Sequence, residues 1–418
     1  MTIDPVHYDG IASLAERIRP EADPEEHRDI AETVWESALD PLYSDGEAVL
    51  SPIDEQRRFA APVDALALQE APFETAHGLD SGTINPTTFK NGLLLDLAQA
   101  AMSRTPSALP LHRERTYIMT VHSNDATVSH GTEEWTEFDE GFGRGRIVQT
   151  ASLARDQERI VHGLALYLAE SHHALDHADT VEDVLVLDGP LYPKGIVHWL
   201  GRNTTIADLA SEDDLVAEVV ENYVRLVEHF LERDRPLVGF VKSPQAGALV
   251  RTLQETGQPT PWASDAAFFS QVLEQREDRR TDGRVRTELA WTNWFRSRLG
   301  ADGVFSGDDA DLGVDRDRSP ESYDVVFTMI YDPRTDLVYK VELPGAFGRE
   351  QSVREAVEQF VLREIAGERG PPRPVAKADE LAKIDAEQKA ELERRLERAF
   401  DTEVDRNYDR ERWGEPYA

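Results

Sequence analysis

The chain has 418 residues, 40% of them hydrophobic, which is enough to bury a core in one large domain or two ordinary ones. Acidic residues outnumber basic ones by 80 to 45, for a net charge of -35, and only seven of the basic residues are lysines. Cysteine is absent, which excludes disulfides, thiolate nucleophiles and cysteine-bound zinc.

The acidic excess is spread along the whole chain. This pattern predicts adaptation to concentrated salt, which screens the repulsion between carboxylates, whereas a surface for basic partners is the alternative. Binding of nucleic acid would have to rest on metal ions and local arginine clusters. No segment approaches the ~18 consecutive apolar residues of a membrane helix, and residues 1–19 lack the apolar core of a signal peptide. We therefore expect a cytoplasmic protein without membrane contact.

The first half of the chain changes character near residue 70. Apolar residues at near-helical spacing, broken by Pro20 and Pro41, predict an N-terminal helical region over residues 1–70. Short apolar runs between Ala76 and Ser123 predict three antiparallel strands. An amphipathic helix over 154–175 and a fully buried strand that leads into Asp188 follow.

The second half continues with alternating helices and strands. We expect a helix at 209–231, a strand at 237–241, a short helix at 245–256, a hairpin of 323–331 with 338–343, and helices at 351–365 and 376–400. Polar loops at 278–284 and 302–322 predict mobile insertions.

The order of three strands, helix, strand, helix, strand predicts an α/β fold with an RNase H-like mixed sheet and helical N- and C-terminal additions. We assign residues 71–385 to this core domain and 386–418 to a C-terminal helix and tail.

Two aspartates follow predicted strands. Asp80 stands in the segment His77 to Thr83, where small residues allow a ligand to approach closely. Asp188 ends the buried run Val184 to Leu187, and an ionised acid there needs a cation or hydrogen-bond donors. Either residue alone could simply begin a turn. As a spaced pair they indicate a metal site.

Two strand carboxylates joined by a third from a neighbouring helix would suit a divalent cation for phosphodiester hydrolysis, because Mg²⁺ and Mn²⁺ prefer oxygen ligands. Glu158 and Glu170 compete for this third position on the helix before Asp188. We favour Glu158 because the strand should return beside the N-terminus of that helix, and because Glu170 points more to solvent on a helical wheel. A solvated glutamate is the alternative for both.

Four short motifs stand in order between Ala76 and Ile384: Leu79-Asp80-Ser81-Gly82, Arg155-Asp156-Gln157-Glu158, Leu187-Asp188-Gly189-Pro190-Leu191 and Tyr339-Lys340-Val341-Glu342-Leu343-Pro344. Together they resemble the NurA nuclease family, whose members carry an Asp-Gly-Ser-like motif, an Arg-x-x-Glu helix start and an Asp-Gly-Ser/Pro-Leu strand end. The resemblance implies that Asp80, Glu158 and Asp188 bind a catalytic Mn²⁺ or Mg²⁺.

The chain departs from the family pattern in two places. Its first motif reads Asp-Ser-Gly, and the segment Gly370 to Asp379 places Asp379 where the family has a histidine. An aspartate can bind a hard metal ion but cannot act as a neutral imidazole base. By resemblance, Asp379 is the fourth candidate metal ligand.

The resemblance also implies an activity and partners. NurA proteins act on DNA as single-strand endonucleases and 5′-to-3′ exonucleases in double-strand break repair, and they work as homodimers bound to a hexameric HerA-type ATPase. The chain has no phosphate-cradling loop of its own, which agrees with the need for such a partner. An RNase H-like nuclease that cuts RNA and a non-catalytic adaptor are the rival hypotheses.

Several other residues are weaker candidates. Lys242, one of the few lysines, follows a predicted strand and could contact a phosphate, or could be an ordinary surface lysine. Trp294 and Arg296, in the cluster Trp291 to Arg296, could bind unpaired bases, although such clusters are more often core. The pair His173 and His177 has metal-ligand spacing, but we interpret it as an exposed polar helix end.

Overall fold

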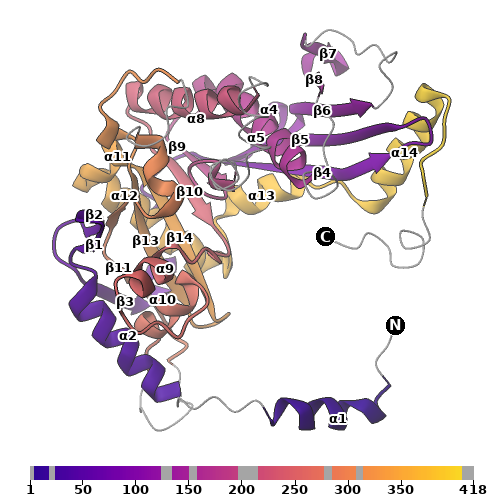
Figure 1. Cartoon of the computed structure of the whole chain (residues 1–418). Helices are drawn as coiled ribbons and strands as arrows, with labels where there is room; N and C mark the ends of the chain where they lie inside the picture. The colour runs from indigo at the N-terminus through magenta and orange to yellow at the C-terminus, as the bar shows by residue number, and fades with distance from the viewer. Residues whose placement is uncertain are drawn as a thin grey trace.

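The computed structural model describes residues 4–17, 24–123, 134–149, 158–195, 215–276, 285–306 and 314–406. Within these residues, fourteen strands form one mixed sheet with helices on both of its faces (Figure 1). The chain therefore has a mixed α/β fold, as the order of its predicted elements indicates.

One part of this sheet carries the candidate acids. Its elements are β4 (Ala76–Thr88), β5 (Leu93–Thr105), β6 (Arg115–Ser123), α5 (Glu158–His177), β9 (Val184–Asp188), α8 (Leu215–Glu232) and β10 (Leu237–Val241). Strands β4, β5 and β6 are antiparallel neighbours, β9 lies parallel to β4, and β10 lies parallel to β9. The predicted strands in these regions are confirmed.

The apolar run of β9 reflects burial on both faces of the sheet. Leu185 and Leu187 pack in a core with α5 and α8, whereas Val184 and Val186 pack in a second core with helices of the opposite face. Figure 1 shows α5 and α8 above this part of the sheet and α13 (Arg373–Ala382) below it. A strand covered on both faces needs no polar side chain until it ends, which places Asp188 at the edge of the core.

The other part of the sheet is built on a long hairpin of β13 (Val325–Asp332) and β14 (Leu337–Pro344), as predicted. Strand β14 pairs with β10 and so joins the two parts. On the far side lie β11 (Glu288–Thr292) and β12 (Phe295–Ser297). Helices α10 (Asp265–Leu273) and α11 (Gly345–Arg349) contact this hairpin directly. Helices α9 (Ala248–Glu255) and α12 (Gln351–Glu368) share hydrophobic cores with it.

The prediction of a helical region over residues 1–70 is wrong in part. Helices α1 (Val6–Ala15), α2 (Pro24–Ala38) and α3 (Val63–Ala67) are present, but β1 (Leu42–Ser44), β2 (Glu47–Pro52) and β3 (Arg58–Pro62) lie between α2 and α3. Strand β2 pairs with β12, and β3 pairs with β11. These partners lie more than 200 residues away, so local periodicity could not reveal them. Helix α1 contains no buried residue.

Two further predictions need correction. The helix expected at 376–400 is two helices, because Asp385 and Gln388 form a capping box that starts α14 (Ala386–Phe400) after α13 has ended. The insertion expected at 302–322 begins with a well-packed residue, since Asp302 is buried and accepts a hydrogen bond from Ser297. The other predicted insertion, 278–284, lies outside the described residues. No helix in the described ranges is both long and apolar enough to cross a membrane.

Candidate metal centre

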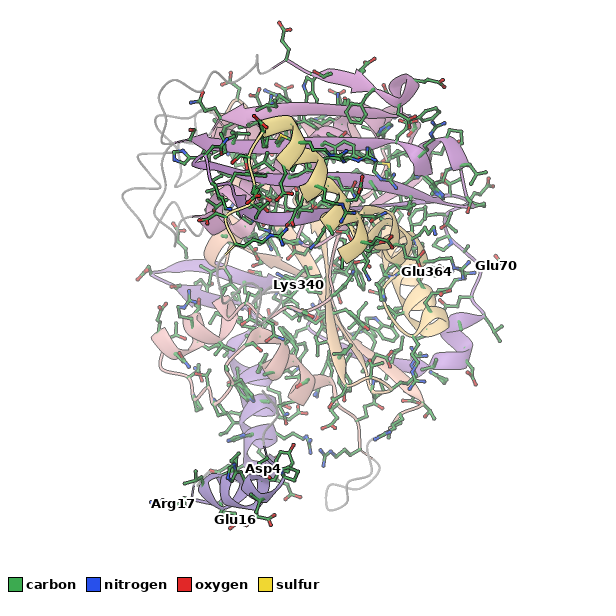
Figure 2. All side chains as sticks on the ribbon, turned by 90° about the vertical axis from the view of Figure 1, so that its right-hand side faces the viewer. Asp4, Glu16, Arg17, Glu70, Lys340 and Glu364 are labelled. Atoms are coloured by element: carbon green, nitrogen blue, oxygen red, sulfur yellow. The ribbon has the colours of Figure 1, made fainter. Side chains whose placement is uncertain are left out.

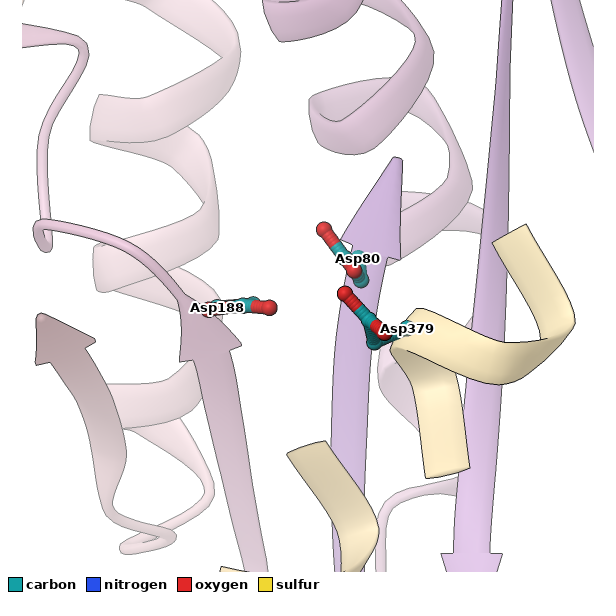
Figure 3. Close-up of side chains that lie close together, drawn as sticks. All are labelled: Asp80, Asp188 and Asp379. Atoms are coloured by element: carbon teal, nitrogen blue, oxygen red, sulfur yellow. The ribbon is translucent and has the colours of Figure 1, made fainter. Parts of the chain in front are cut away.

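Three aspartates from distant parts of the sequence converge at the C-terminal end of β9. Leu79 of β4 pairs with Leu187 of β9, so the residues that follow them, Asp80 and Asp188, lie side by side on neighbouring parallel strands. Asp379 reaches them from α13, and Figure 3 shows the three side chains pointing into one space. One carboxylate oxygen from each of the three lies within 4.8 Å of the other two.

Helix α13 can approach this closely because glycines line the strand beneath it. A Cβ atom on Gly78 would lie 2.2 Å from the carbonyl oxygen of Pro374, and one on Gly82 would lie 2.1 Å from that of Ala382. Ser103 also donates a hydrogen bond of 2.5 Å to the Pro374 carbonyl. These contacts hold both ends of α13 against β4 and β5, which brings Asp379 over Asp80.

The electrostatics of the centre are those of crowded carboxylates. Burial, the neighbouring Asp188 and then Glu170 raise the pKa of Asp80 to about 9. Burial also raises the pKa of Asp188, although Lys242 partly opposes this shift. Charged carboxylates this close repel one another unless a proton or a cation lies among them.

Lys242 supplies one positive charge to the centre. Its Nζ lies 2.5 Å from Asp188 Oδ2 and 3.5 Å from Asp379 Oδ1. Burial lowers the pKa of Lys242, but its hydrogen bond to Asp188 and the surrounding aspartates more than reverse this and raise it. The residue just after β10 is therefore an ion-pair partner of the acids, rather than a free surface lysine.

Glu170 is the glutamate of α5 that the structure brings to this region. Its carboxylate accepts hydrogen bonds from the hydroxyl groups of Ser81, at 2.5 Å, and Tyr223, at 3.0 Å. Burial raises the pKa of Glu170 to about 7 even though both hydrogen bonds act in the opposite direction. The expectation that Glu170 points to solvent is therefore wrong, because the sheet side of α5 includes this residue.

Glu158 is the first residue of α5, and its side chain lies outside the described residues. The twelve residue steps from Glu158 to Glu170 correspond to ~18 Å along a helix axis. Since Glu170 already lies next to Ser81, the N-terminus of α5 is far from Asp80. We favoured Glu158 because we expected the N-terminus of this helix to lie beside Asp188, and that expectation is wrong.

A second charged cluster lies on β14 and in the loop that follows Asp188, and it was not predicted from the sequence. Glu342 of β14 is fully buried and accepts a hydrogen bond from the backbone N–H of Leu191, in the loop that follows Asp188. Lys194 and Lys340 contact Glu342 at 2.6 and 2.7 Å, and Lys194 also contacts Asp302 at 2.6 Å. The scarcity of lysine is the signal that could have identified this cluster, because Lys194, Lys242 and Lys340 are three of only seven.

The predicted base-binding residues lie elsewhere. Trp294 is 5% exposed and donates a hydrogen bond from its indole nitrogen to Glu358, so it belongs to the core and offers no face to a base. Arg296 on β12 is partly exposed and lies 3.9 Å from Asp324. Strand β12 is four strands away from β9 in the sheet, so neither residue joins the metal centre.

The interpretation of His173 and His177 as an exposed helix end is also wrong. His173 is completely buried, and its Nδ1 lies 3.0 Å from the hydroxyl of Thr116. His177 lies 3.1 Å from a carboxylate oxygen of Glu114. Both histidines pack between α5 and the strands, because the C-terminal half of α5 is buried against the sheet.

The residues of the centre suit a divalent cation. All of the converging ligands are carboxylate oxygens, which hard ions such as Mg²⁺ and Mn²⁺ prefer. Three aspartates face a single lysine, and burial together with the neighbouring acids Asp188 and Glu170 raises the pKa of Asp80. A divalent ion bound to Asp80, Asp188 and Asp379 would supply it.

Comparison with known proteins yields a family and distant structural likenesses. A family model, the NurA domain, matches residues 74–384. The fold is similar to the crystal structure of the NurA nuclease from Sulfolobus solfataricus, with 12% identity, a TM-score of 0.49 and coverage of 96% of this chain and 98% of that one. It is also similar to a structure of NurA bound to dAMP and manganese, with 10% identity, a TM-score of 0.44 and coverage of 98% of this chain and 99% of that one. A search of curated proteins found no match.

Proposed function

The chain belongs to the NurA family, and from this premise we propose that it is a metal-dependent nuclease whose metal centre is the group Asp80, Asp188 and Asp379. The convergence of these three carboxylates at the end of β9 is the observation that carries the proposal. We assign Glu170 to the same centre as the helix acid, in place of Glu158.

Each residue has a distinct part in this proposal. Asp80, Asp188 and Asp379 would hold Mn²⁺ or Mg²⁺, which in such sites polarises a phosphoryl oxygen and lowers the pKa of bound water. Lys242, held by Asp188, would place a positive charge beside the phosphate of the substrate. Glu170, whose pKa lies near 7, would be able to accept or release a proton at neutral pH.

The proposal includes the finer expectations from the sequence. We propose that the substrate is DNA, cut as a single-strand endonuclease and a 5′-to-3′ exonuclease during end resection in a cytoplasm. We further propose a homodimer that works with a HerA-type hexameric ATPase. The order β10-β9-β4-β5-β6, in which only β5 runs antiparallel to the other four strands, supports an RNase H-like core.

A cleavage assay tests the activity. Purified protein in concentrated salt with Mn²⁺ should degrade labelled single-stranded DNA, and Asp80→Asn and Asp188→Asn should each lower the rate by about 100-fold or more, because each removes a metal ligand. Glu387→Gln, an exposed position on α14, is the matched control and should cut at the wild-type rate.

The assay also separates the rival functions. Equal rates for wild type and Asp188→Asn would contradict the nuclease proposal and favour an adaptor. Faster cleavage of RNA than of DNA would show that RNA is the preferred substrate and would favour the rival RNA nuclease. Parallel assays with Mn²⁺ and Mg²⁺ would identify the preferred ion.

A further inference from the structure

Helix α1 has an apolar face without a partner. Its side chains of Tyr8, Ile11 and Leu14 are 55%, 49% and 60% exposed, and no residue of the helix is buried. Figure 1 and the labelled Asp4, Glu16 and Arg17 in Figure 2 show α1 standing apart from the body of the molecule. A ten-residue helix is marginal in water on its own, so its stability requires that this face packs against something.

The chain also presents an apolar groove that nothing in its described part fills. The groove has a volume of about 770 Å³ and lies between the sheet and the helices α13 and α14. Its apolar lining includes Leu97, Tyr117, Met119, Ile147, Leu381 and Leu392. Phe138 of β7 (Thr136–Phe138) and Ile147 of β8 (Gly143–Gln149) are 45% and 37% exposed at its edge.

The dimensions of the two features agree. Arg115, Tyr117 and Met119 line the groove along β6, and the four residue steps between the first and the last span ~13 Å. The ten residues of α1 are ~15 Å long. The groove is therefore long enough for the apolar face of one short helix.

The charges are complementary as well. Of the three acidic residues between Asp4 and Arg17, Asp4 and Glu16 lie at the two ends of α1, whereas Asp9 lies on the side away from Ile11. In the groove, Arg115 donates hydrogen bonds only to backbone carbonyls, and neither Arg115 nor Lys383 pairs with a carboxylate in the described ranges. Against these two cations the groove lining has one acid, Glu134. In so acidic a chain, unneutralised cations indicate that a negatively charged element belongs there.

The connection of α1 favours a groove on another copy of the chain. Helix α2 packs on β12 through Trp35 and Phe295, whereas β6 lies seven strand spacings from β12, or ~34 Å. Figure 1 likewise shows α2 and α14 at opposite ends of the molecule.

We infer that α1 of one copy docks, through Tyr8, Ile11 and Leu14, into the groove between β5, β6, β8 and the helices α13 and α14 of a second copy. The interaction is independent of the proposed nuclease activity. It gives a dimer in which an exchanged helix contacts α13, the helix that carries Asp379.

The absence of cysteine makes a direct test possible, because any introduced pair of thiols is unique. In the double variant Ile11→Cys with Ile147→Cys, docking in the second copy should bring the thiols within disulfide distance. Mild oxidation should then yield a covalent dimer of two 47.0 kDa chains on a non-reducing gel. Both positions are exposed, so folding should be unaffected, and the circular dichroism spectrum checks this.

The matched control is Asp9→Cys with Ile147→Cys. Residue 9 lies two positions before Ile11, about 200° around the helix, so its thiol should face away from the groove and the covalent dimer should be lost. A disulfide within one monomer in the Ile11 variant would overturn docking in a second copy. Free thiols after oxidation, or equal cross-linking in the Asp9 variant, would overturn docking of this helix face.

Discussion

At the scale of single residues, the metal centre gathers more negative charge than its one lysine neutralises. Asp80, Asp188 and Asp379 share the space that Lys242 enters from one side, and Glu170 adds its charge from α5. The pKa of Asp80 rises to about 9 because burial and these neighbours disfavour its charged form. A divalent cation bound among these aspartates would oppose that shift, because it favours their charged form.

The choice between the two glutamates of α5 can be tested directly. Glu170→Gln should lower the cleavage rate by about 10-fold to 100-fold, because Glu170 is the residue that contacts Ser81 beside Asp80. Glu158→Gln is the control and should retain the rate. Initial rates on labelled single-stranded DNA with Mn²⁺ measure both, and loss of activity only in Glu158→Gln would reverse the assignment.

Glu342 should make the stability of the protein depend on pH. Burial raises its pKa, but Lys194 and Lys340 more than offset this and lower it to about 2, against 4.5 for a free glutamate. The stabilisation is therefore fully present above pH 4.5 and is lost as the pH falls towards 2.

Glu342→Gln should accordingly lower the free energy of unfolding at pH 7 by about 3–5 kcal/mol, because the half-buried Lys194 and Lys340 lose the buried carboxylate that they share. The difference from wild type should shrink as the pH falls from 4.5 towards 2. Denaturant unfolding at several pH values measures it, and a constant difference would contradict the argument. The control is Glu391→Gln, whose carboxylate is paired on the surface and should contribute little.

At the scale of elements, the position of Asp379 depends on how closely α13 lies on β4. Gly78→Ala would place a Cβ atom 2.2 Å from the backbone of Pro374, so α13 must move. We expect a loss of about 1–3 kcal/mol in stability from this overpacking. Because Asp379 moves with α13, weaker Mn²⁺ binding in a calorimetric titration should accompany it.

Gly367→Ala provides the matched control for this substitution. Gly367 lies in α12, and a Cβ atom there would meet nothing within 4 Å. The substitution should therefore stabilise the protein by about 0.5–1 kcal/mol and leave Mn²⁺ binding unchanged. Unchanged Mn²⁺ affinity in Gly78→Ala would show that α13 does not position a metal ligand.

At the scale of the whole molecule, the net charge of -35 opposes the compact state unless salt screens it. The thermal unfolding midpoint should therefore rise when KCl is increased from about 0.2 to about 2 M. An equally concentrated neutral osmolyte, which does not screen charge, is the control. A midpoint that does not change with KCl, or that rises as much with the osmolyte, would contradict adaptation to salt.

Much of the core fold could be predicted because local patterns encode it. The run Val184 to Leu187 is apolar on both faces, and alternation with turn residues marks the strands between Ala76 and Ser123. The strand at 58–62 could not be predicted, because it forms only by pairing with β11 much later in the chain. The hairpin of β1 and β2 was missed although Asp45-Gly46 at its turn is a local signal. The break between α13 and α14 depends on one capping box at Asp385, within a continuous helical pattern.

The sequence by itself determined the type of chemistry at the centre. It showed two aspartates after buried strands, an aspartate in the place of a family histidine, and no thiol chemistry. Only the tertiary structure decided which residues meet. The position of α5 along the sheet decides whether Glu158 or Glu170 lies near Asp80. The contact with Glu358 of α12 decides that Trp294 belongs to the core and not to the surface. Both are set by contacts between segments far apart in the chain, which no local pattern contains.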